Sequence, residues 1–484
     1  MKRVSDLKDK NLFRQAALIS GQWVKASDDR VIDVVDPATG EAIGTVPNCT
    51  RVDTEIAIAA ADEAFQSWRK VPHEQRALLL ERWFDLMQEH EDDLALLLTL
   101  EQGKPLAEAK GEIGYGASFV KWFAEEARRI DGGLIPSPTS DRRILTLKEP
   151  VGVSAIITPW NFPNAMITRK VGPALAAGCT VVIKPSDLTP YSALALGVLA
   201  ERAGIPAGVI NIVTGMPIDI GAALTSSETV RKLSFTGSTR VGSLLMEQCA
   251  PTVKRLSLEL GGNAPFIVFD DADLDAAVGG AIASKFRNGG QTCVCSNRIL
   301  VQSGIYNAFA EKLCAVVKAM KVGPGQAGAE IGPMINSAAI EKIDRHIDDA
   351  VSKGAKIMGQ AKTPDGQYAA PTVLGNCDTS MQLASEETFG PLAPLFRFEK
   401  EEDAIEIANA TPFGLAAYFY TESLARAWRM GEALEFGMVG LNTGIVSTTV
   451  SPFGGVKQSG LGREGAKTGI EEYLETKAFH MGNL

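Results

Sequence analysis

The feature that most restricts the fold is an alternation of short β-branched runs with longer helical runs, which begins at Val151. This pattern is typical of parallel βα units and disfavours a sandwich or a helical bundle. Gly178 and Gly204 follow two of the helical runs, where a left-handed C-terminal cap favours glycine. We therefore expect a doubly wound α/β sheet of the nucleotide-binding kind. Its predicted strands are Val151–Ile157, Thr180–Lys184, Val209–Val213, Arg231–Phe235 and Arg255–Glu259, with helices near 164–177, 190–203, 217–225 and 239–249.

Further elements flank this sheet on both sides. Residues 52–130 have the apolar spacing of consecutive amphipathic helices, which we expect to cover one face of the sheet. The spacing is carried by Ile58, Ala61, Phe65 and Trp68, and then by Leu78, Leu79, Trp83 and Leu86. Beyond the sheet, strand-like Phe266–Phe269 and Arg298–Gln302 flank a predicted helix from Asp271 to Phe286 and open a second α/β domain. A chain of 484 residues also exceeds the roughly 250–300 that one core supports.

Two segments, Asp141–Glu149 and Glu471–His480, are predicted to form exposed edge strands. Proteins usually cover such strands by pairing them with another chain or element. We take them as a sign of oligomerisation.

Charge and cysteine content exclude several classes of function. The net charge of −10, without clustered Lys or Arg, disfavours a nucleic-acid partner or an anionic membrane. No segment reaches the ~18 apolar residues that span a bilayer, and no signal peptide is apparent, so we expect a cytoplasmic protein. The seven cysteines are thinly spread along the chain, which favours reduced thiols over a disulfide framework. The four histidines are scattered and show no metal-binding spacing, so no metal site is expected.

Cys293 is the candidate nucleophile. It follows Gly289, Gly290, Gln291 and Thr292, a loop flexible enough to bring backbone amides close to a substrate oxygen. Most cysteines are buried and inert, and we expect this of the other five that lie outside the Cys293–Cys295 pair.

Two polar residues follow predicted strands and qualify as partners of the thiol. Asn161, after the first strand, is a candidate oxyanion donor, although an Asn there equally suits a helix cap. Glu259 ends a strand before Gly261 and is a candidate general base, although such a residue is more often solvated or ion-paired. Glu387 is equally ambiguous by itself.

A cofactor phosphate site is predicted where Phe235-Thr-Gly-Ser-Thr-Arg-Val-Gly242 joins a strand to a helix. Gly237 and Ser238 lie at the positively polarised helix start, where a pyrophosphate is favoured. The Gly-x-Gly-x-x-Gly pattern at 460–465 is rejected as a dinucleotide loop, because no strand precedes it and too little chain follows.

Together these motifs resemble those of the aldehyde dehydrogenase superfamily, in its order and over nearly the whole chain. They are Pro159-Trp-Asn-Phe-Pro163, Phe235-Thr-Gly-Ser238, Leu258-Glu-Leu-Gly-Gly262, Gly290-Gln-Thr-Cys293, Glu387-Thr-Phe-Gly-Pro391 and Pro452-Phe-Gly-Gly455. Within the family the chain is similar to bacterial succinate-semialdehyde dehydrogenases. That similarity lies in Ile167-Thr-Arg-Lys170, Lys285-Phe-Arg-Asn288 and Cys293-Val-Cys295.

The resemblance implies a Rossmann-type NAD(P)-binding domain (1–130 and 150–259), an α/β catalytic domain (260–466) and a small β oligomerisation arm (131–149 and 467–484). It implies that Cys293 attacks the aldehyde, Asn161 and the Cys293 amide hold the oxyanion, and Glu259 drives thioester hydrolysis. Glu464 would assist a proton relay and Lys170 would support the site. Lys184 and Glu387 would hold the cofactor riboses, and Trp160, Ser238 and Leu260 would line the cofactor path.

For the substrate, the resemblance points to Arg169, Arg287 and Ser447 as a clamp on a distal carboxylate. The alternative is that either Arg pairs with an internal carboxylate. The cofactor choice between NADP and NAD stays open, because Ser186 suits a 2′-phosphate whereas Asp187 repels one.

Several readings stay open. Cys295 suggests a strained, reversible disulfide with Cys293, or only a spectator thiol. Succinate and glutarate semialdehyde differ by one methylene, worth roughly 1–3 kcal/mol in a pocket. A cysteine hydrolase and a non-catalytic structural protein are the rival classes. The assembly is expected to be a homo-oligomer, a dimer or a tetramer.

Overall fold

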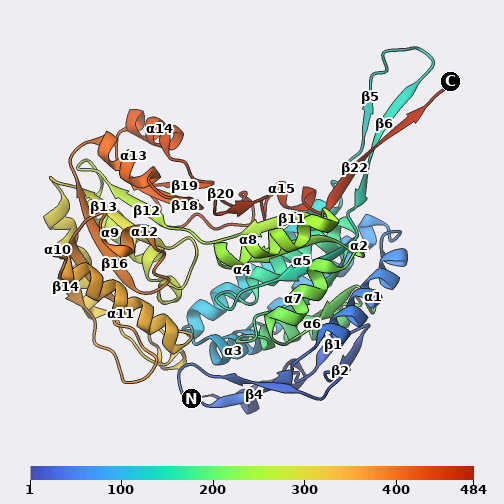
Figure 1. The fold of residues 1–484 in the computed structure, drawn as a ribbon, viewed down its shortest axis with the longest axis horizontal. Coiled ribbons are helices and arrows are strands. Elements are labelled where there is room, and N and C mark those ends of the chain that lie inside the picture. The colour runs from blue at the N-terminus through green and yellow to red at the C-terminus, as the bar shows by residue number, and fades with distance from the viewer. Residues whose placement is uncertain (1, 484) are drawn as a thin grey trace.

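A mixed eight-stranded sheet forms one half of the molecule, shown on the right of Figure 1. The computed structural model describes residues 2–483. The strand order is β2-β1-β9-β8-β7-β10-β11-β21, and the five strands from β9 to β11 run parallel. These five are Ile210–Ile212 (β9), Thr180–Lys184 (β8), Val153–Ile157 (β7), Val230–Thr236 (β10) and Arg255–Glu259 (β11). The predicted α/β sheet is confirmed, and β8 and β11 match their predicted bounds.

Helices cover both faces of this sheet. Four of them connect its strands: Ala165–Ala177 (α5), Tyr191–Ala203 (α6), Pro217–Ser226 (α7) and Thr239–Cys249 (α8). The first two end at Gly178 and Gly204, whose φ angles of 98° and 88° are the left-handed caps expected of glycine. Apolar residues of α7, α8 and the earlier helix Arg51–Trp68 (α1) pack on one face, and those of α5 and α6 pack on the other. The sheet is therefore doubly wound.

Three further helices form an outer layer over α5 and α6, namely His73–Glu89 (α2), Glu91–Gln102 (α3) and Leu106–Ala127 (α4). The predicted apolar face of α1 is buried at all four positions. On α2 the predicted face is wrong in part, because Leu78 is 46% exposed and Leu80, Trp83 and Met87 are the buried residues. The three consecutive leucines 78–80 make the helical period of the apolar residues ambiguous, and in the folded chain the third of them, Leu80, is the one that packs into the core.

Four short strands near the N-terminus were not predicted: Ala17–Ile19 (β1), Gln22–Val24 (β2), Val31–Val35 (β3) and Ala42–Pro47 (β4). The strands β1 and β2 extend the first sheet beyond β9, and both of these added pairings are antiparallel. At three residues each, they are too short to show an alternating pattern.

A second, seven-stranded sheet forms the other half, with the order β14-β15-β16-β13-β12-β18-β19. Its strands are Lys356–Gln360, Thr372–Cys377, Leu392–Phe398, Ser296–Gln302, Ala264–Val268, Ala416–Tyr420 and Met438–Leu441, in that order. The predicted strand–helix–strand start is confirmed as β12, the helix Leu274–Lys285 (α9) and β13. The helices Tyr306–Ala319 (α10), Ser337–Ser352 (α11), Gln382–Ser385 (α12), Glu401–Asn409 (α13) and Leu424–Ala433 (α14) surround this sheet.

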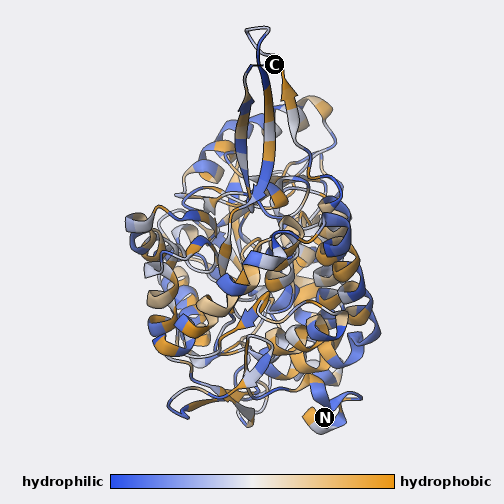
Figure 2. Cartoon of the chain, turned by 90° about the vertical axis from the view of Figure 1, so that its right-hand side faces the viewer, coloured by the Kyte–Doolittle hydropathy of each residue, from blue (hydrophilic) through white to orange (hydrophobic). Residues whose placement is uncertain are grey.

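A three-stranded antiparallel arm projects from the first half, as Figures 1 and 2 show. It consists of Gly133–Ile135 (β5), Arg143–Pro150 (β6) and Leu474–Met481 (β22). The two predicted edge strands therefore pair with each other, over eight residues from Leu474↔Pro150 to Met481↔Arg143. The segment β6 is the central strand, so the prediction that it is an edge is wrong.

One late strand joins the two halves. Gly460–Leu461 (β21) follows the second sheet in the chain, yet it pairs antiparallel with β11 of the first sheet. A two-residue strand, Val456–Lys457 (β20), precedes residues 460–465, so the prediction that no strand does so is wrong. The rejection of these residues as a dinucleotide loop is still supported, since β21 is antiparallel and the next helix, Thr468–Glu471 (α15), begins only later. Within residues 2–483 no helix has both the length and the apolar character needed to cross a membrane.

Candidate active site

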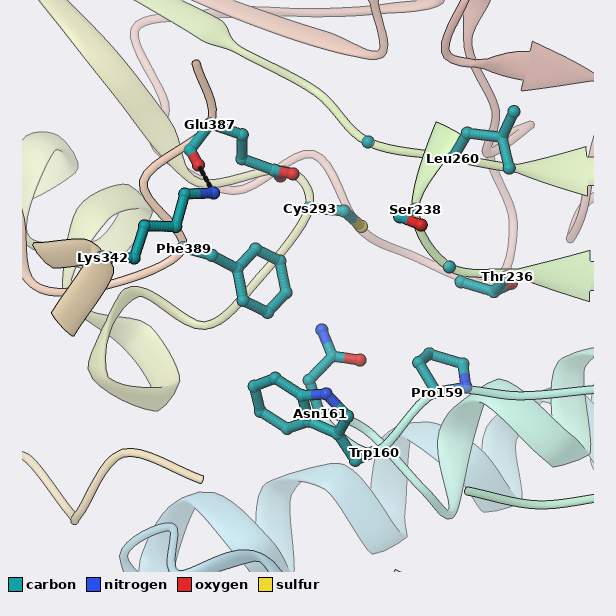
Figure 3. A pocket seen from close by; sticks show the side chains of 12 residues that line it. Pro159, Trp160, Asn161, Thr236, Ser238, Leu260, Cys293, Lys342, Glu387 and Phe389 are labelled. Atoms are coloured by element: carbon teal, nitrogen blue, oxygen red, sulfur yellow. Dashed lines mark hydrogen bonds between the residues drawn. The ribbon is translucent and has the colours of Figure 1, made fainter. Parts of the chain in front are cut away.

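A cavity of about 240 Å³ lies between the two halves, and Figure 3 shows its lining. Seven predicted site residues share it: Trp160, Asn161, Gly237, Ser238, Leu260, Cys293 and Glu387. They come from both sides, because Trp160 and Asn161 follow β7 and Gly237 follows β10, whereas Glu387 precedes β16. This is the carboxyl edge of the first sheet, where ligands of open α/β sheets bind.

A second, smaller cavity of about 30 Å³ touches the first at Cys293, which lines both. It contains the three predicted substrate residues, Arg169, Arg287 and Ser447. Cys293 therefore lies at the junction of a larger and a smaller cavity.

The Cys293 thiol is partly buried in the loop between α9 and β13. Burial raises the pKa of this thiol to about 12, and the charge of Arg169 offsets the effect only in part. At neutral pH the resting side chain is therefore a thiol that needs a base. Its backbone N–H donates no hydrogen bond to any group of residues 2–483 and stays available for an oxyanion.

The Asn161 side chain faces the larger cavity in Figure 3. Its Nδ2 donates to the carbonyl oxygen of Gln291 at 3.0 Å, which leaves the second N–H for another acceptor. The predicted alternative of a helix cap is wrong, since the N-cap of α5 is Asn164.

Glu259 ends β11 with its side chain buried. Its Oε2 has no hydrogen-bond partner within the described chain, and a Cβ atom at Gly454 would lie 2.9 Å from Oε1. Burial raises the pKa of Glu259 well above its usual value, and the charge of Glu464 raises it further. A carboxyl group in this setting is a stronger base once ionised.

Glu464 is the centre of a buried ion-pair cluster. It contacts both Lys170 Nζ and Arg169 Nε, and Lys170 also donates to Ser234 Oγ at 3.1 Å. The Arg169 contact is an ion pair without the angles of a hydrogen bond. Burial raises the pKa of Glu464, but Arg169 and Lys170 outweigh it, so that pKa falls below its usual value. Burial also lowers the pKa of Lys170, against the effect of Glu464.

The residues predicted to hold the cofactor extend from the larger cavity to β8. Ser238 caps the N-terminus of α8, where its Oγ accepts from Val241 N. Lys184 ends β8, nine-tenths or more buried, with Nζ 3.6 Å from Asp187 Oδ1. Burial lowers the pKa of Lys184, and Asp187 offsets this in part. Ser186 Oγ accepts from Leu188 N at 3.2 Å and still has its own proton to donate.

The lining fits a nicotinamide nucleotide. Thr236 Oγ1 is buried at the cavity without a hydrogen-bond partner in the described part of the chain, and so offers an unused polar contact. Glu387 accepts from Gly262 N at 3.4 Å, and burial raises its pKa to about 7. Trp160 packs edge-on against Phe389, with 5.6 Å between ring centroids.

Cys295 is buried behind the nucleophile loop. Its Sγ accepts from Lys285 Nζ at 3.2 Å, and both Cys293 and Cys295 are free thiols here. Burial raises the pKa of Cys295, and Lys285 offsets this in part. The disulfide with Cys293 stays a prediction.

Sequence reasoning missed several residues of the site. In the larger cavity they are Pro159, Thr236, Gly261, Lys342 and Phe389, and in the smaller one Tyr115, Phe162, Ala165, Met166, Thr292, Val294 and Phe453. Lys342 donates to the Glu387 carbonyl oxygen (Figure 3), and the Tyr115 hydroxyl is buried and unpartnered within residues 2–483. Tyr115 and Lys342 lie on helices with no local signal that distinguishes them from packing or surface residues.

Comparison with known proteins gives a consistent result over nearly the whole chain. A model of the aldehyde dehydrogenase family matches residues 23–479. A glutarate-semialdehyde dehydrogenase of Pseudomonas putida is 60% identical over 472 residues, which cover 97% of this chain and 98% of the relative. A succinate-semialdehyde dehydrogenase of Escherichia coli whose name carries NADP(+) is 59% identical, covering 98% and 99%. The crystal structure of an aldehyde dehydrogenase from Brucella melitensis has a TM-score of 0.98 at 60% identity, with 99% of each chain covered.

Proposed function

The chain belongs to the aldehyde dehydrogenase family and is an NAD(P)-dependent oxidoreductase, and from this premise we propose that it oxidises succinate semialdehyde to succinate. Glutarate semialdehyde is the alternative substrate. One observation carries the proposal: Cys293 lines both cavities, and the smaller one also holds the guanidinium of Arg287. A glutarate-semialdehyde and a succinate-semialdehyde dehydrogenase are 60% and 59% identical to this chain, so the kinetic panel below decides between the two substrates.

In the proposed mechanism Cys293 gives its proton to Glu259, and the sulfur adds to the aldehyde carbon. Asn161 Nδ2 and the Cys293 N–H stabilise the oxyanion of the resulting thiohemiacetal. The nicotinamide nucleotide, when bound, supplies the acceptor for the hydrogen and electron pair of the aldehyde C–H bond, so that a thioester remains on Cys293. Glu259 passes the Cys293 proton on to the relay described below and, ionised again, takes a proton from water, whose oxygen displaces the thiolate to give the carboxylic acid.

The proton that Glu259 takes from Cys293 must leave before the same carboxylate can activate water. Glu464 interacts with the Glu259 charge and is bound to Lys170, so we assign these two residues to the proton relay. Lys184 and Glu387 are assigned to the cofactor riboses, and Gly237, Ser238, Trp160 and Leu260 to the cofactor path. Lys184 with Ser186 favours a 2′-phosphate and Asp187 opposes it, so both NAD and NADP are expected to serve.

Selection for a distal carboxylate depends mainly on Arg287 in this proposal. Arg169 is already ion-paired to Glu464, whereas Arg287 stacks over Phe162 at 5.3 Å and has no ion-pair partner within residues 2–483. An unpaired guanidinium binds a carboxylate through charge-assisted hydrogen bonds, and a neutral aldehyde leaves it unsatisfied. Ser447 supplies a hydroxyl at the same cavity.

A panel of kcat/KM values for succinate semialdehyde, glutarate semialdehyde and butanal, each with NAD and NADP, tests the substrate. We expect Arg287→Ala to lower kcat/KM for succinate semialdehyde by about 10²-fold and to change that for butanal little. Arg397→Ala, an exposed arginine outside the cavities, is the control. Equal losses for the charged and the neutral aldehyde would disprove the carboxylate clamp.

We also propose the division into a cofactor domain (1–130 and 150–259), a catalytic domain (260–466) and an arm (131–149 and 467–484). The arm is proposed to bind a second copy of the chain, in a dimer or a tetramer. We also propose a cytoplasmic location, which fits the seven free cysteines.

A further inference from the structure

Lys104 is a fully buried lysine that the mechanism above does not use. It lies two residues before α4 and is 2% exposed. Its Nζ donates to Glu112 Oε2 at 2.5 Å and to the backbone carbonyl oxygen of Asn161 at 2.8 Å, and it lies 3.9 Å from the ring centroid of Phe162. A buried ammonium is costly, so it is retained only where its bonds are satisfied. One of those bonds goes to the residue that is assigned to the oxyanion.

The same carbonyl oxygen connects the two active-site loops. Asn288 Nδ2 donates to it at 3.0 Å and also to the Gln291 carbonyl oxygen at 3.3 Å, which in turn accepts from Asn161 Nδ2. Asn288 lies in the left-handed region at φ 51°, and Glu108 Oε2 on α4 accepts its N–H at 2.8 Å. The start of α4 therefore contacts both the loop of Asn161 and the loop of Cys293.

Glu112 extends this contact to the helix that follows the Asn161 loop. Its Oε1 accepts the backbone N–H groups of Asn164 and Ala165, at 2.9 and 3.2 Å. These are the first donors of α5, so the carboxylate holds the far end of the loop while Lys104 holds its middle.

We propose that Lys104 is a positioning residue: its ammonium fixes the Asn161 peptide so that the side-chain amide is held at oxyanion distance from Cys293. The inference rests on the roles proposed for Asn161 and Cys293. Loss of the ammonium leaves the Asn161 carbonyl oxygen with only the Asn288 donor, so that the loop can shift, and a displacement of about 1 Å at a reacting centre costs about 10²-fold in rate. The effect is expected on kcat rather than on substrate binding, because the oxyanion exists only in the transition state and intermediate.

The first test is a double-mutant cycle. Lys104→Met is expected to lower kcat about 10²-fold with little change in KM, and with an unchanged Kd for NADH measured by fluorescence titration. In an Asn161→Ala background the same change should cost less than about 3-fold, because both variants remove one function. Lys110→Met, on α4 with an exposed ion pair to Asp92, is the control and is expected to keep wild-type activity.

The second test separates positioning from stability. Lys104→Met alone leaves Glu112 buried without its cation, whereas Lys104→Met with Glu112→Gln removes both charges and keeps an oxygen for the α5 donors. We expect the double variant to regain thermal stability relative to the single one, with kcat still low. Recovery of kcat together with stability would make Lys104 merely structural.

The outcomes distinguish the inference from its basis. If Asn161→Ala itself keeps full activity, the proposed oxyanion role fails. If Asn161→Ala lowers kcat but Lys104→Met does not, only the role of Lys104 is overturned. The same conclusion follows if the two losses of kcat multiply in the double variant.

Discussion

At the scale of single residues, the proposed base Glu259 lies buried at the end of β11, and we expect it to set the pH dependence of the reaction. The pKa of this carboxyl is raised well above its usual value by burial, so its basic form is lost as pH falls through that raised value. We expect kcat to rise with pH across the neutral range, with an acidic limb far above that of an exposed glutamate. The measurement is a kcat profile from about pH 5 to 10.

The matching variant is Glu259→Gln, which keeps the shape of the side chain and removes the base. It is expected to lower kcat by about 10²–10⁴-fold and to eliminate this limb. An acidic limb that survives in Glu259→Gln would assign the titration to another group, such as the thiol of Cys293.

Residue roles were predictable to the extent that they rest on local motifs. Cys293 was predicted from its glycine-rich loop, and Asn161 and Glu259 from their positions at strand ends. Cys293 and Asn161 line one cavity, whereas Glu259 is buried outside the lining and its charge raises the pKa of the Cys293 thiol. The sequence left open that either clamp arginine pairs with an internal carboxylate, but it could not name Glu464, which lies 295 positions after Arg169 in the chain. Only the folded chain shows that one of the two clamp arginines already has a carboxylate.

At the scale of elements, Glu101 at the end of α3 caps a different helix. Its two oxygens accept from the N–H groups of Tyr191 and Ser192, which begin α6. Burial raises the pKa of Glu101 to about 8, against those hydrogen bonds. The unfolded chain ionises near the ordinary pKa of about 4.3, so folding stability falls as pH rises from there to about 8 and then levels.

Glu101→Gln removes this titration. The substitution removes one acceptor oxygen, so the variant is expected to have a lower free energy of unfolding than the wild type at about pH 5. This difference should shrink as the pH approaches 8, because only the wild type loses stability through the titration of Glu101. Urea unfolding at several pH values measures it, with the exposed Glu63→Gln on α1 as control. Parallel stability curves for wild type and variant would contradict the buried titration.

Element prediction succeeded where helix and strand periods persisted over several turns. The central βα units were located to within about two residues at their ends. Three of the missed strands, β1, β2 and β21, share a cause, because they are three or two residues long and depend on pairing with distant strands. The three leucines 78–80 of α2 each define a possible buried face of the helix, and only packing against α4 and α6 decides which face is buried.

At the scale of the whole molecule, the arm presents an apolar row. Leu134 and Phe479 both pair with Leu145 of β6, from opposite sides, and are 71% and 47% exposed. Exposed apolar rows on an edge are usually covered by another chain. We expect Leu134→Glu with Phe479→Glu to lower the assembled mass in light scattering while the monomer stays folded.

The control for the arm is Val351→Glu, which adds a charge at a single exposed apolar residue of α11. Its mass is expected to equal that of the wild type. An unchanged mass in the double arm variant would remove the arm as the basis of assembly.

The late strand β21 also has a consequence for how the chain is made. The chain emerges from the ribosome N-terminus first, so β11 leaves the exit tunnel about 200 residues before its partner strand β21. The interval between β6 and its partner β22 is longer still. During that interval one edge of the first sheet and one edge of the arm are open to pairing with neighbouring nascent chains. We expect a translation stall after β19 to yield aggregation-prone intermediates that chaperones bind, whereas full-length release closes both edges almost at once.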